Sequence, residues 1–514
     1  MVVPVVTKLL PLAIGWWLCC QHVSGEYYSS VEQMRQLINL EESLIASLGR
    51  YIKLHGQKIE FLTRQRDLLA KELKEGKKQE IAYVSNPVSA FLLTNRLVTE
   101  WERMRTFMTM DVGAKLENTT AMPTSEDVLG VAEAMARLQD IYQLTAKQMA
   151  SGKILDRKFG RQLKTAECYE IGNKLSSTGN YRYALEWLRE SLRLWSMESP
   201  GVSKVEVMNG LSFVLSHLGE YEEALEFTKK VLKLQPDNQI ALKSKEPIEQ
   251  WIEYKKQHGL PATPPMPNYG NYPSLCRGDY QRPLKELANL RCRYEHRRTP
   301  FLRIAPLKLE ELSHDPYIVV YHEVISTKEI DTVLTISKPL LHRSMVGASQ
   351  KKEVSKTRTS NNGWLEDAMH RVVARISQRT EDMTDLAMSA AEQLQVGNYG
   401  VGGHYLPHHD YAIPEPGKDA YPDVGKGNRI ATVMYYLSDV DIGGATVFPE
   451  IGVGIFPQKG SAIFWYNLHA NGTVDSRTLH AACPVLVGSK WVANKWIHEY
   501  GQEFRRPCSL DPKA

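Results

Sequence analysis

The sequence predicts a multidomain protein that is α-helical through its first half and β-rich toward its carboxyl end. Three observations lead to this fold class: a long helical pattern of apolar residues, a motif that recurs after forty residues, and a series of short β-type runs beyond about residue 304. At 514 residues the chain exceeds one ordinary core, so two to four domains are expected.

Residues 1–25 have the pattern of a cleavable signal peptide. Lys8 precedes an apolar run over residues 9–20, and small residues up to Gly25 offer a cleavage site. The run is shorter than the roughly 20 apolar residues of a membrane helix, although an uncleaved anchor is the alternative. No later stretch predicts stable membrane insertion. Entry into the secretory lumen makes the sequons at Asn118 and Asn471 expected glycosylation sites.

The composition is that of a soluble globular protein, with 43% hydrophobic and 24% charged residues. A formal net charge of +4 over the whole chain is close to neutral. Binding to nucleic acid usually requires a concentrated basic face. We therefore expect no nucleic-acid partner.

Five cysteines remain once Cys19 and Cys20 leave with the signal peptide: Cys168, Cys276, Cys292, Cys483 and Cys508. None forms a Cys-x-x-Cys pair, which argues against a zinc ribbon or a thioredoxin-type site. In an oxidising lumen we expect two disulfides and one spare thiol. Proximity favours Cys276–Cys292 and Cys483–Cys508, but spacing leaves the connectivity open. Cys168 lies in a helical pattern and is expected to be the buried free thiol.

Residues 26–145 begin with a long amphipathic helical pattern. Apolar residues recur at spacings of three, four or seven from Met34 to Leu69 among many charges. Such a seam suits a coiled coil or a helical hairpin, although Gly49 and Gly56 weaken the helix. Packing within the chain's own domain and pairing of two subunits both explain the seam. We interpret 26–145 as a helical dimerisation region.

Residues 146–250 contain a weak internal repeat. Gly179-Asn180-Tyr181 is followed by Ala-Leu-Glu at 184–186, and Gly219-Glu220-Tyr221 is followed by Ala-Leu-Glu at 224–226. This is the tetratricopeptide pattern of one helix–turn–helix per repeat. Two such repeats form a concave surface that commonly holds an extended peptide. The sequence thus predicts a peptide-substrate-binding domain without chemistry of its own.

A linker at 251–303, rich in proline and tyrosine, separates these helices from a β-rich region at 304–514. The β-type runs lie at 316–320, 429–437, 461–465 and 482–487, with Gly- and Pro-rich turns between them. Many short strands with such turns are typical of a sandwich or a jelly-roll.

A candidate metal site lies within the β-rich region. In a strand, residues two apart share a face, so His408 and Asp410 can converge while His409 points away. With His480 they supply two imidazoles and one carboxylate, which leaves positions open as oxygen-activating iron(II) requires. Closed structural zinc would require a fourth protein ligand. On its own, a His-x-Asp triplet often arises by chance.

Lys490 follows His480 by ten residues in a strand-like run. A cation at the end of a barrel can pair with the remote carboxylate of a keto acid that chelates the metal. Without the three candidate ligands, a surface lysine would be the simpler reading.

Several long motifs around these residues resemble collagen prolyl 4-hydroxylase α-subunits. They are the segments 399–410, 427–432, 443–450, 480–488 and 496–508. The order of the preceding regions, a helical amino terminus and then a two-repeat module, is similar to that family across nearly the whole mature chain.

The resemblance implies an iron(II)- and 2-oxoglutarate-dependent dioxygenase with a double-stranded β-helix (jelly-roll) catalytic domain. It implies that His408, Asp410 and His480 bind Fe(II), and that Lys490 binds the distal carboxylate of 2-oxoglutarate. The expected reaction places a hydroxyl on C4 of peptidyl proline in X-Pro-Gly sequences, consuming O2 and releasing succinate and CO2. L-Ascorbate is the expected rescuing reductant.

The resemblance also assigns six further residues. It implies that the cosubstrate pocket is lined by Tyr399 and Thr446, and that His498 assists the chemistry there. The residues implied to receive the peptidyl proline are Tyr405, Arg429 and Trp496. A protein disulfide isomerase β-subunit in an α2β2 tetramer is the implied partner. It would hold the enzyme in the endoplasmic reticulum lumen, because this chain ends without a retention signal of its own.

One departure from the family concerns the peptide groove. The helix around Gly210, Phe213 and Ser216 has fewer aromatic residues than the tyrosine-lined family groove, and aromatic faces are what grip polyproline II peptides. The alternatives are therefore the same chemistry on non-collagen proline-rich proteins, or a non-catalytic peptide-binding subunit.

Overall fold

The structure of the protein, a computed structural model, describes residues 29–78, 97, 101–110, 125–154, 157–158, 161–197, 201–259, 270–296, 299–346, 353–354, 357–413, 420–421 and 424–509. The expected signal peptide and the Asn118 sequon lie outside these residues, as do residues 260–269 of the expected linker.

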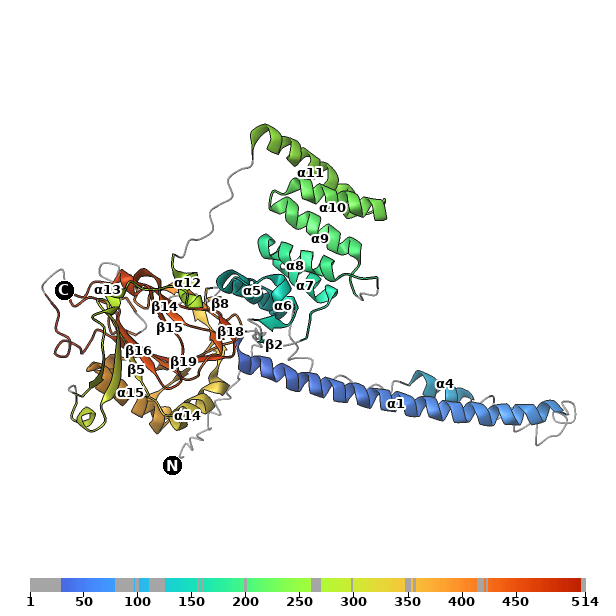
Figure 1. Ribbon diagram of the computed structural model, residues 1–514. Helices are drawn as coiled ribbons and strands as arrows, with labels where there is room; N and C mark the ends of the chain where they lie inside the picture. Colours follow the sequence, from blue (N-terminus) through green and yellow to red (C-terminus); the bar gives the residue numbers. More distant parts are fainter. Residues whose placement is uncertain are drawn as a thin grey trace, which may run out of the picture.

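The long helix α1 (Val31–Lys78) projects away from the rest of the molecule, and α4 (Trp101–Thr109) lies along its far half (Figure 1). Leu62, in the predicted seam, borders a cavity that residues of α4 help to line. Ile38 and Ile52, nearer the start of the seam, are 66% and 62% exposed. This half of the seam therefore has no apolar cover within the described chain. None of the described helices is both long and apolar enough to cross a bilayer.

The predicted repeats form successive helix pairs: α7 (Thr165–Ser177), α8 (Tyr181–Leu194), α9 (Lys204–His217) and α10 (Tyr221–Leu234), followed by α11 (Gln239–His258). Gly179 and Gly219 end the first helix of each pair with φ of +79°, a left-handed conformation that favours glycine. Trp187, Leu175 and Leu211 are fully buried between the helices. The tetratricopeptide-like prediction is confirmed.

The β-rich region is built on an antiparallel sheet with nine described strands, in the order β3-β4-β5-β16-β12-β19-β10-β9-β6. Their bounds are β3 (Cys292–Glu295), β4 (Leu307–His314), β5 (Tyr317–His322), β16 (Ala462–Tyr466), β12 (Arg429–Tyr436), β19 (Lys490–His498), β10 (Leu394–Tyr399), β9 (Asn361–Leu365) and β6 (His342–Arg343).

Side chains of the central strands alternate between two apolar layers. On one face, α14 (Thr327–Ser337) and α15 (Arg371–Thr384) cover the sheet, and Val433 packs in that core. The neighbouring Met434 points to the opposite layer together with Trp465. This period of two is what a strand buried on both faces requires.

A smaller sheet closes the second layer, in the order β11-β17-β14-β15. Its strands are β11 (Tyr405–His408), β17 (His480–Ala482), β14 (Thr446–Phe448) and β15 (Val453–Ile455). Phe448 of this sheet and Trp465 of the large sheet share one core, so the two sheets form a sandwich. The β-rich, jelly-roll prediction is confirmed. The predicted run 482–487 is split before β18 (Val485–Val487), because Pro484 has no N–H to donate.

The cysteine pairing that proximity favoured is wrong in the structure. Cys276 is bonded to Cys483, with Cα atoms 5.5 Å apart, although the two residues are 207 positions apart in the sequence. Cys292 and Cys508 are exposed thiols, whereas Cys168 is a buried thiol as predicted. Proximity fails because α12 (Tyr272–Arg277) packs on β14 and carries Cys276 into an apolar cluster with Cys483.

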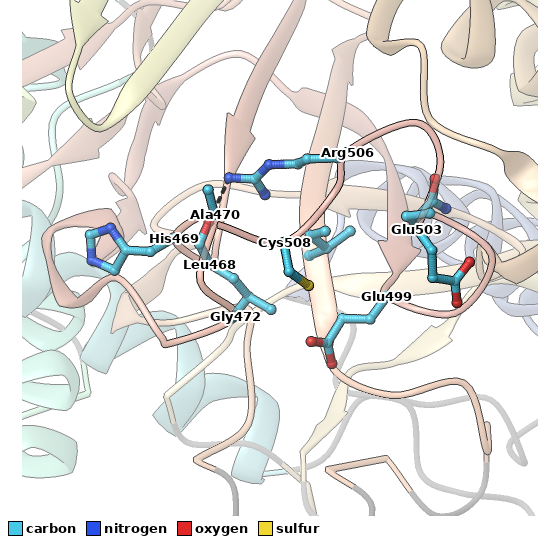
Figure 2. Close-up of a pocket in the computed structure, with 10 residues that line it drawn as sticks. Leu468, His469, Ala470, Gly472, Glu499, Glu503, Arg506 and Cys508 are labelled. Carbon is cyan, nitrogen blue, oxygen red and sulfur yellow. Dashed lines mark hydrogen bonds between the residues drawn. The ribbon is translucent and has the colours of Figure 1, made fainter. Parts of the chain in front are cut away.

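Cys508 lies instead in a small pocket beside Ala470 (Figure 2). Arg506 donates to the carbonyl oxygen of Leu468, and the backbone N–H of Ser509 donates to that of Ala470. These bonds fix the carboxyl-terminal segment along the 468–472 loop, which accounts for the position of Cys508.

Candidate metal centre and its surroundings

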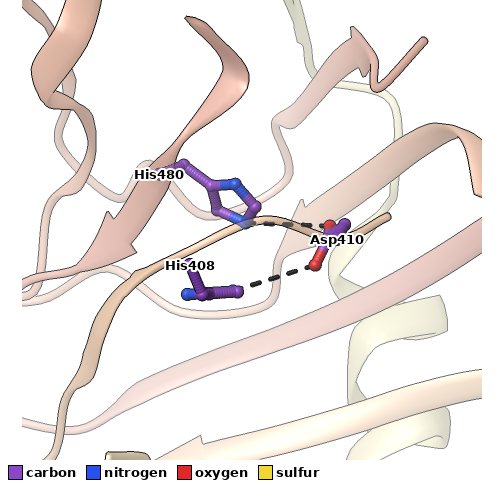
Figure 3. Close-up of side chains that lie close together, drawn as sticks. All are labelled: His408, Asp410 and His480. Carbon is purple, nitrogen blue, oxygen red and sulfur yellow. Dashed lines mark ion pairs between the residues drawn. The ribbon is translucent and has the colours of Figure 1, made fainter. Parts of the chain in front are cut away.

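The structure brings the predicted ligands His408, Asp410 and His480 together (Figure 3). Their candidate ligand atoms all lie within 4.8 Å of one another. His408 ends β11 and pairs directly with His480 at the start of β17, with the ring centres 4.3 Å apart. Asp410 comes from the bend after the strand, and its oxygens lie 3.8 Å and 3.7 Å from Nε2 of the two imidazoles. Two imidazoles and one carboxylate are the donor set that non-haem iron(II) sites use.

Backbone carbonyl groups orient both imidazoles. Nδ1 of His408 lies 2.8 Å from the carbonyl oxygen of Leu406, and Nδ1 of His480 lies 3.0 Å from that of Thr478. Because a carbonyl oxygen only accepts, Nδ1 carries the proton and the lone pair of Nε2 remains for a metal. Burial lowers the pKa of both histidines, which favours the neutral form that binds metals.

Asp410 is fixed by hydrogen bonds from two sides. Thr432 donates to its Oδ2 over 2.8 Å, and Asn467 donates to Thr432 in turn. The hydroxyl of Tyr421 donates to the backbone oxygen of Asp410 over 2.6 Å. Burial acts to raise the pKa of Asp410, but the two imidazoles and a nearby guanidinium lower it to about 2. The carboxylate is therefore ionised and pre-oriented.

Lys490 is a buried cation beside this centre, with 1% of its surface exposed. Its Nζ donates to Oγ1 of Thr446 over 3.2 Å and lies 5.7 Å from the ring centres of Tyr399 and Tyr436. Among the described residues, no carboxylate forms an ion pair with it, and burial lowers its pKa to about 7. A buried amine without an anion is costly. The site therefore fits a cosubstrate that brings a carboxylate to Lys490.

A second cluster of charges adjoins the metal centre at Arg429. The guanidinium forms a forked pair with Glu392, at 2.6 Å from Nε and 3.1 Å from Nη2, and lies 3.9 Å from the ring centre of Trp496. Arg429 also donates to the backbone oxygen of Asp410. The predicted proline-binding residues Arg429 and Trp496 are thus in contact.

His498 belongs to the same cluster. Its Nε2 lies 3.0 Å from Oε1 of Glu392, and its Nδ1 lies 2.7 Å from the carbonyl oxygen of Gly427. Both partners carry oxygen atoms that accept hydrogen bonds, so the imidazole is held at both of its ring nitrogens. Glu392 therefore lies between the guanidinium of Arg429 and the imidazole of His498.

The structure accounts for the remaining predicted residues. Thr446 and Tyr399, predicted to line the cosubstrate pocket, both lie against Lys490. Tyr405 stacks on the ligand His408 with ring centres 3.4 Å apart. His409 turns away from the centre and bonds the carbonyl oxygen of Ser476.

The sequence did not reveal Glu392, Tyr421 or Thr432 as site residues. Glu392 precedes β10 in no recognisable motif, and Tyr421 lies in a segment between strands. Thr432 alone could have been found, because it ends the family-like segment 427–432. Simple alternation would not find it, since residues 429 and 432 lie on opposite faces of a regular strand. The pairing of β12 with β19 does shift register between residues 429 and 431.

Three family descriptions match successive parts of the chain. The prolyl 4-hydroxylase alpha-subunit N-terminal region matches residues 30–156, and the prolyl 4-hydroxylase peptide-substrate-binding domain matches 165–253. The 2OG-Fe(II) oxygenase superfamily matches 394–498, which includes the candidate ligands and Lys490.

Whole-chain relatives agree with this order. The chain is 38% identical over 511 residues to prolyl 4-hydroxylase subunit alpha-1 of Homo sapiens and of Rattus norvegicus, covering 94% of this chain and 96% of each relative. It is 34% identical to subunit alpha-2 of Caenorhabditis elegans, covering 95% and 94%. A solved viral collagen prolyl hydroxylase from Paramecium Bursaria Chlorella virus-1 is 27% identical, covering 35% of this chain and 94% of that one, with a TM-score of 0.29. From the full-length identity and the matched regions, the chain belongs to the prolyl 4-hydroxylase α-subunit family.

Proposed function

We propose that this chain is the catalytic subunit of a prolyl 4-hydroxylase that hydroxylates C4 of peptidyl proline in collagen-like X-Pro-Gly sequences. The reaction uses Fe(II), O2 and 2-oxoglutarate and releases succinate and CO2. One observation carries the proposal: a His-Asp-His cluster stands beside Lys490, a buried cation with no carboxylate partner among the described residues. A triad alone suits several metals and reactions, whereas the added buried cation calls for an anionic cosubstrate.

In this proposal His408, Asp410 and His480 hold the iron, which supplies the oxidising chemistry when it binds 2-oxoglutarate. Lys490 receives the distal carboxylate of the cosubstrate. Thr446, already hydrogen-bonded to Lys490, holds the amine in position. The surrounding aromatic rings exclude water and so strengthen this ion pair.

The peptide side of the site has a different character. Trp496 and Tyr405 offer flat apolar faces to a proline ring, and Arg429, with its charge already balanced by Glu392, offers donors to a peptide carbonyl. His498, held at both ring nitrogens by Gly427 and Glu392, is assigned by family resemblance to assist the chemistry of the cosubstrate. The bound proline is oriented by these groups rather than activated by them.

The proposal extends to the rest of the protein. We assign 1–25 to a signal peptide, 26–145 to subunit dimerisation, 146–250 to peptide binding and 304–514 to catalysis. Residues 251–303 are assigned to a linker, whose end adds strand β3 to the large sheet. The exposed seam of α1 supports the dimer assignment. We further assign the chain to the endoplasmic reticulum lumen, in an α2β2 tetramer with protein disulfide isomerase, with L-ascorbate as the rescuing reductant and glycans on Asn118 and Asn471.

The test is a reaction of the chain, co-expressed with protein disulfide isomerase, with Fe(II), 2-oxoglutarate, ascorbate and a Pro-Pro-Gly repeat peptide. Mass spectrometry should find one added oxygen per modified proline, lost when 2-oxoglutarate is omitted. Succinate formed only with other proline-rich peptides would keep the chemistry and change the substrate. If an iron-loaded complex neither hydroxylates any peptide nor forms succinate, the catalytic assignment is refuted.

A further inference from the structure

The helix α5 (Ser125–Tyr142) lies between the repeat helices and the β-rich region (Figure 1). On its repeat side, Ala132 and Ala136 belong to the apolar core of the repeats. Gln139 accepts a buried hydrogen bond of 2.7 Å from the indole N–H of Trp187. Because small side chains and a buried polar bond fix this contact, α5 moves with the repeats as one unit.

The other side of α5 is bonded to the β-rich region. Nε of Arg137 donates to the carbonyl oxygen of Gly402 over 3.3 Å, and the hydroxyl of Tyr142 donates to that of Pro484 over 2.5 Å. A Cβ on Gly402, whose φ is +68°, would lie 2.5 Å from the Cβ of Ala134. The helix is therefore packed directly against the turn that contains Gly402.

Both contact points belong to segments that carry the metal site. Gly402 lies between Tyr399 and the strand β11 that ends at His408, and Pro484 follows the strand that begins at His480. The two segments are joined to each other, since the N–H of Gly402 donates to the carbonyl oxygen of Val485 over 2.7 Å. α5 thus spans the junction of the two ligand-bearing segments.

A second set of contacts joins α5 to helix α12 of the linker. Arg277 of α12 donates to the carbonyl oxygen of Ile141 over 2.8 Å. The next residue back, Cys276, is the one bonded to Cys483. Ile141 is buried in one cluster with both cysteines. The end of α5 is therefore fixed covalently and by packing to the strand that follows His480.

We propose that α5 is a positioning element that holds the peptide-binding repeats at a fixed place relative to the metal centre, with Arg137 and Tyr142 as its positioning residues. The inference rests on the proposed function. A peptide long enough to occupy the repeats then reaches the metal centre as an intramolecular event, at an effective concentration set by the fixed separation. A peptide too short to reach both places gains nothing from α5. Weakening the contact between α5 and the β-rich region lowers this effective concentration and leaves the rate of the catalytic step unchanged.

The experiment uses the full chain with its partner subunit and compares wild type with the double variant Arg137→Met, Tyr142→Phe. Each is assayed with a long Pro-Pro-Gly repeat peptide and with a peptide of one Pro-Pro-Gly unit. The matched control is Arg303→Met, Tyr294→Phe, which removes the same groups from exposed positions. The double variant should raise KM for the long peptide by about tenfold or more. Its kcat, and its KM for the short peptide, should stay within about twofold of wild type.

Three outcomes overturn the inference. They are an unchanged ratio of the two KM values, an equal loss on both peptides, and a wild type without any advantage for the long peptide. Failure of the wild type to hydroxylate either peptide would instead refute the proposed function. If the double variant does not fold, as judged by thermal unfolding, each single variant should still raise KM for the long peptide alone.

Discussion

Oε1 of Glu392 lies 3.0 Å from Nε2 of His498, and the same carboxylate forms a fork with Arg429. Burial acts to raise the pKa of Glu392, but its hydrogen bond with His498 and the charge of Arg429 hold it below its ordinary value. Glu392→Gln removes the anion and leaves the buried guanidinium of Arg429 without this ion-pair partner. We expect a loss of about 3 kcal/mol in the free energy of unfolding and a higher KM for peptide.

The pH dependence separates this effect from a simple packing defect. Since the pKa of Glu392 is lower in the folded than in the unfolded state, its stabilisation is present at neutral pH and is lost as the pH falls through the folded value. The difference between wild type and variant, from urea unfolding at several pH values, should shrink in acid. Glu366→Gln, at an exposed carboxylate bonded to Gln393, should change neither quantity.

The metal assignment can be tested at His408, with the adjacent His409 as the control. His408 faces Asp410 and His480, whereas His409 bonds a backbone carbonyl outside the cluster. His408→Ala should abolish both iron retention and turnover because it removes a ligand. His409→Ala should retain both and lose about 1 kcal/mol of stability at most. Metal content after dialysis and succinate release give the two readouts, and equal iron loss in the two variants would move the site elsewhere.

What the sequence could predict follows from how local each feature is. The period-two pattern and the repeated Gly-x-Tyr turns are short-range, so the sandwich and the repeats could be predicted. The Cys276–Cys483 bond and the Glu392 cluster could not, because each joins segments that only the folded sheet order brings together. Motif likeness found Arg429 but not Glu392, the carboxylate that balances it.

Lys490 should couple cosubstrate binding to proton uptake. Burial lowers its pKa to about 7 from the ordinary value of 10.5, so much of the amine is neutral above pH 7 until a carboxylate binds beside it. Binding of 2-oxoglutarate to the metal-loaded, oxygen-free protein should then take up protons increasingly as the pH rises above 7. Isothermal titration in buffers of different ionisation heat measures this uptake.

Lys495 supplies the matched control for Lys490. It is also buried, on the same strand, but its Nζ lies 3.8 Å from Asp367. Lys490→Met should remove the proton uptake and weaken 2-oxoglutarate binding, whereas Lys495→Met should preserve both. Without cosubstrate, wild type should gain stability as the pH rises from about 7 to 10.5, because the unfolded chain binds the proton that the native state gives up. A flat profile there would contradict the assignment.

The disulfide can be checked by peptide mapping without reduction. The linked fragments should contain Cys276 and Cys483, with Cys292 and Cys508 alkylated as free thiols. Cys483→Ser should cost about 2–5 kcal/mol of stability, whereas Cys292→Ser and Cys508→Ser should cost little because both side chains are exposed. Recovery of a fragment that links Cys276 to Cys292 would contradict this assignment and support the pairing that proximity favours.

The repeats carry their aromatic residues in an uneven way that predicts where peptide is held. In α9 the equivalent stripe is Gly210, Phe213 and His217, whereas 41 positions on, in α11, it is Trp251, Tyr254 and His258. The rings of Tyr221 and Trp251 stack with centres 5.6 Å apart, and Trp251 is 46% exposed. Stacked, exposed aromatic faces bind polyproline II segments. The ring that α9 lacks at Gly210 is present on α11 as Trp251.

Trp251→Ala should therefore weaken binding of a proline-rich peptide about five- to tenfold, the equivalent of roughly 1–1.5 kcal/mol for one aromatic contact. Fluorescence anisotropy of a labelled polyproline peptide on the metal-free protein isolates this step from catalysis. Ile240→Ala removes an apolar side chain that is 63% exposed on the same helix and should leave the affinity unchanged. Since Gly210 offers no ring at the position equivalent to Trp251, a loss confined to α9 variants such as Phe213→Ala would place the peptide on the middle helix and contradict the assignment to α11.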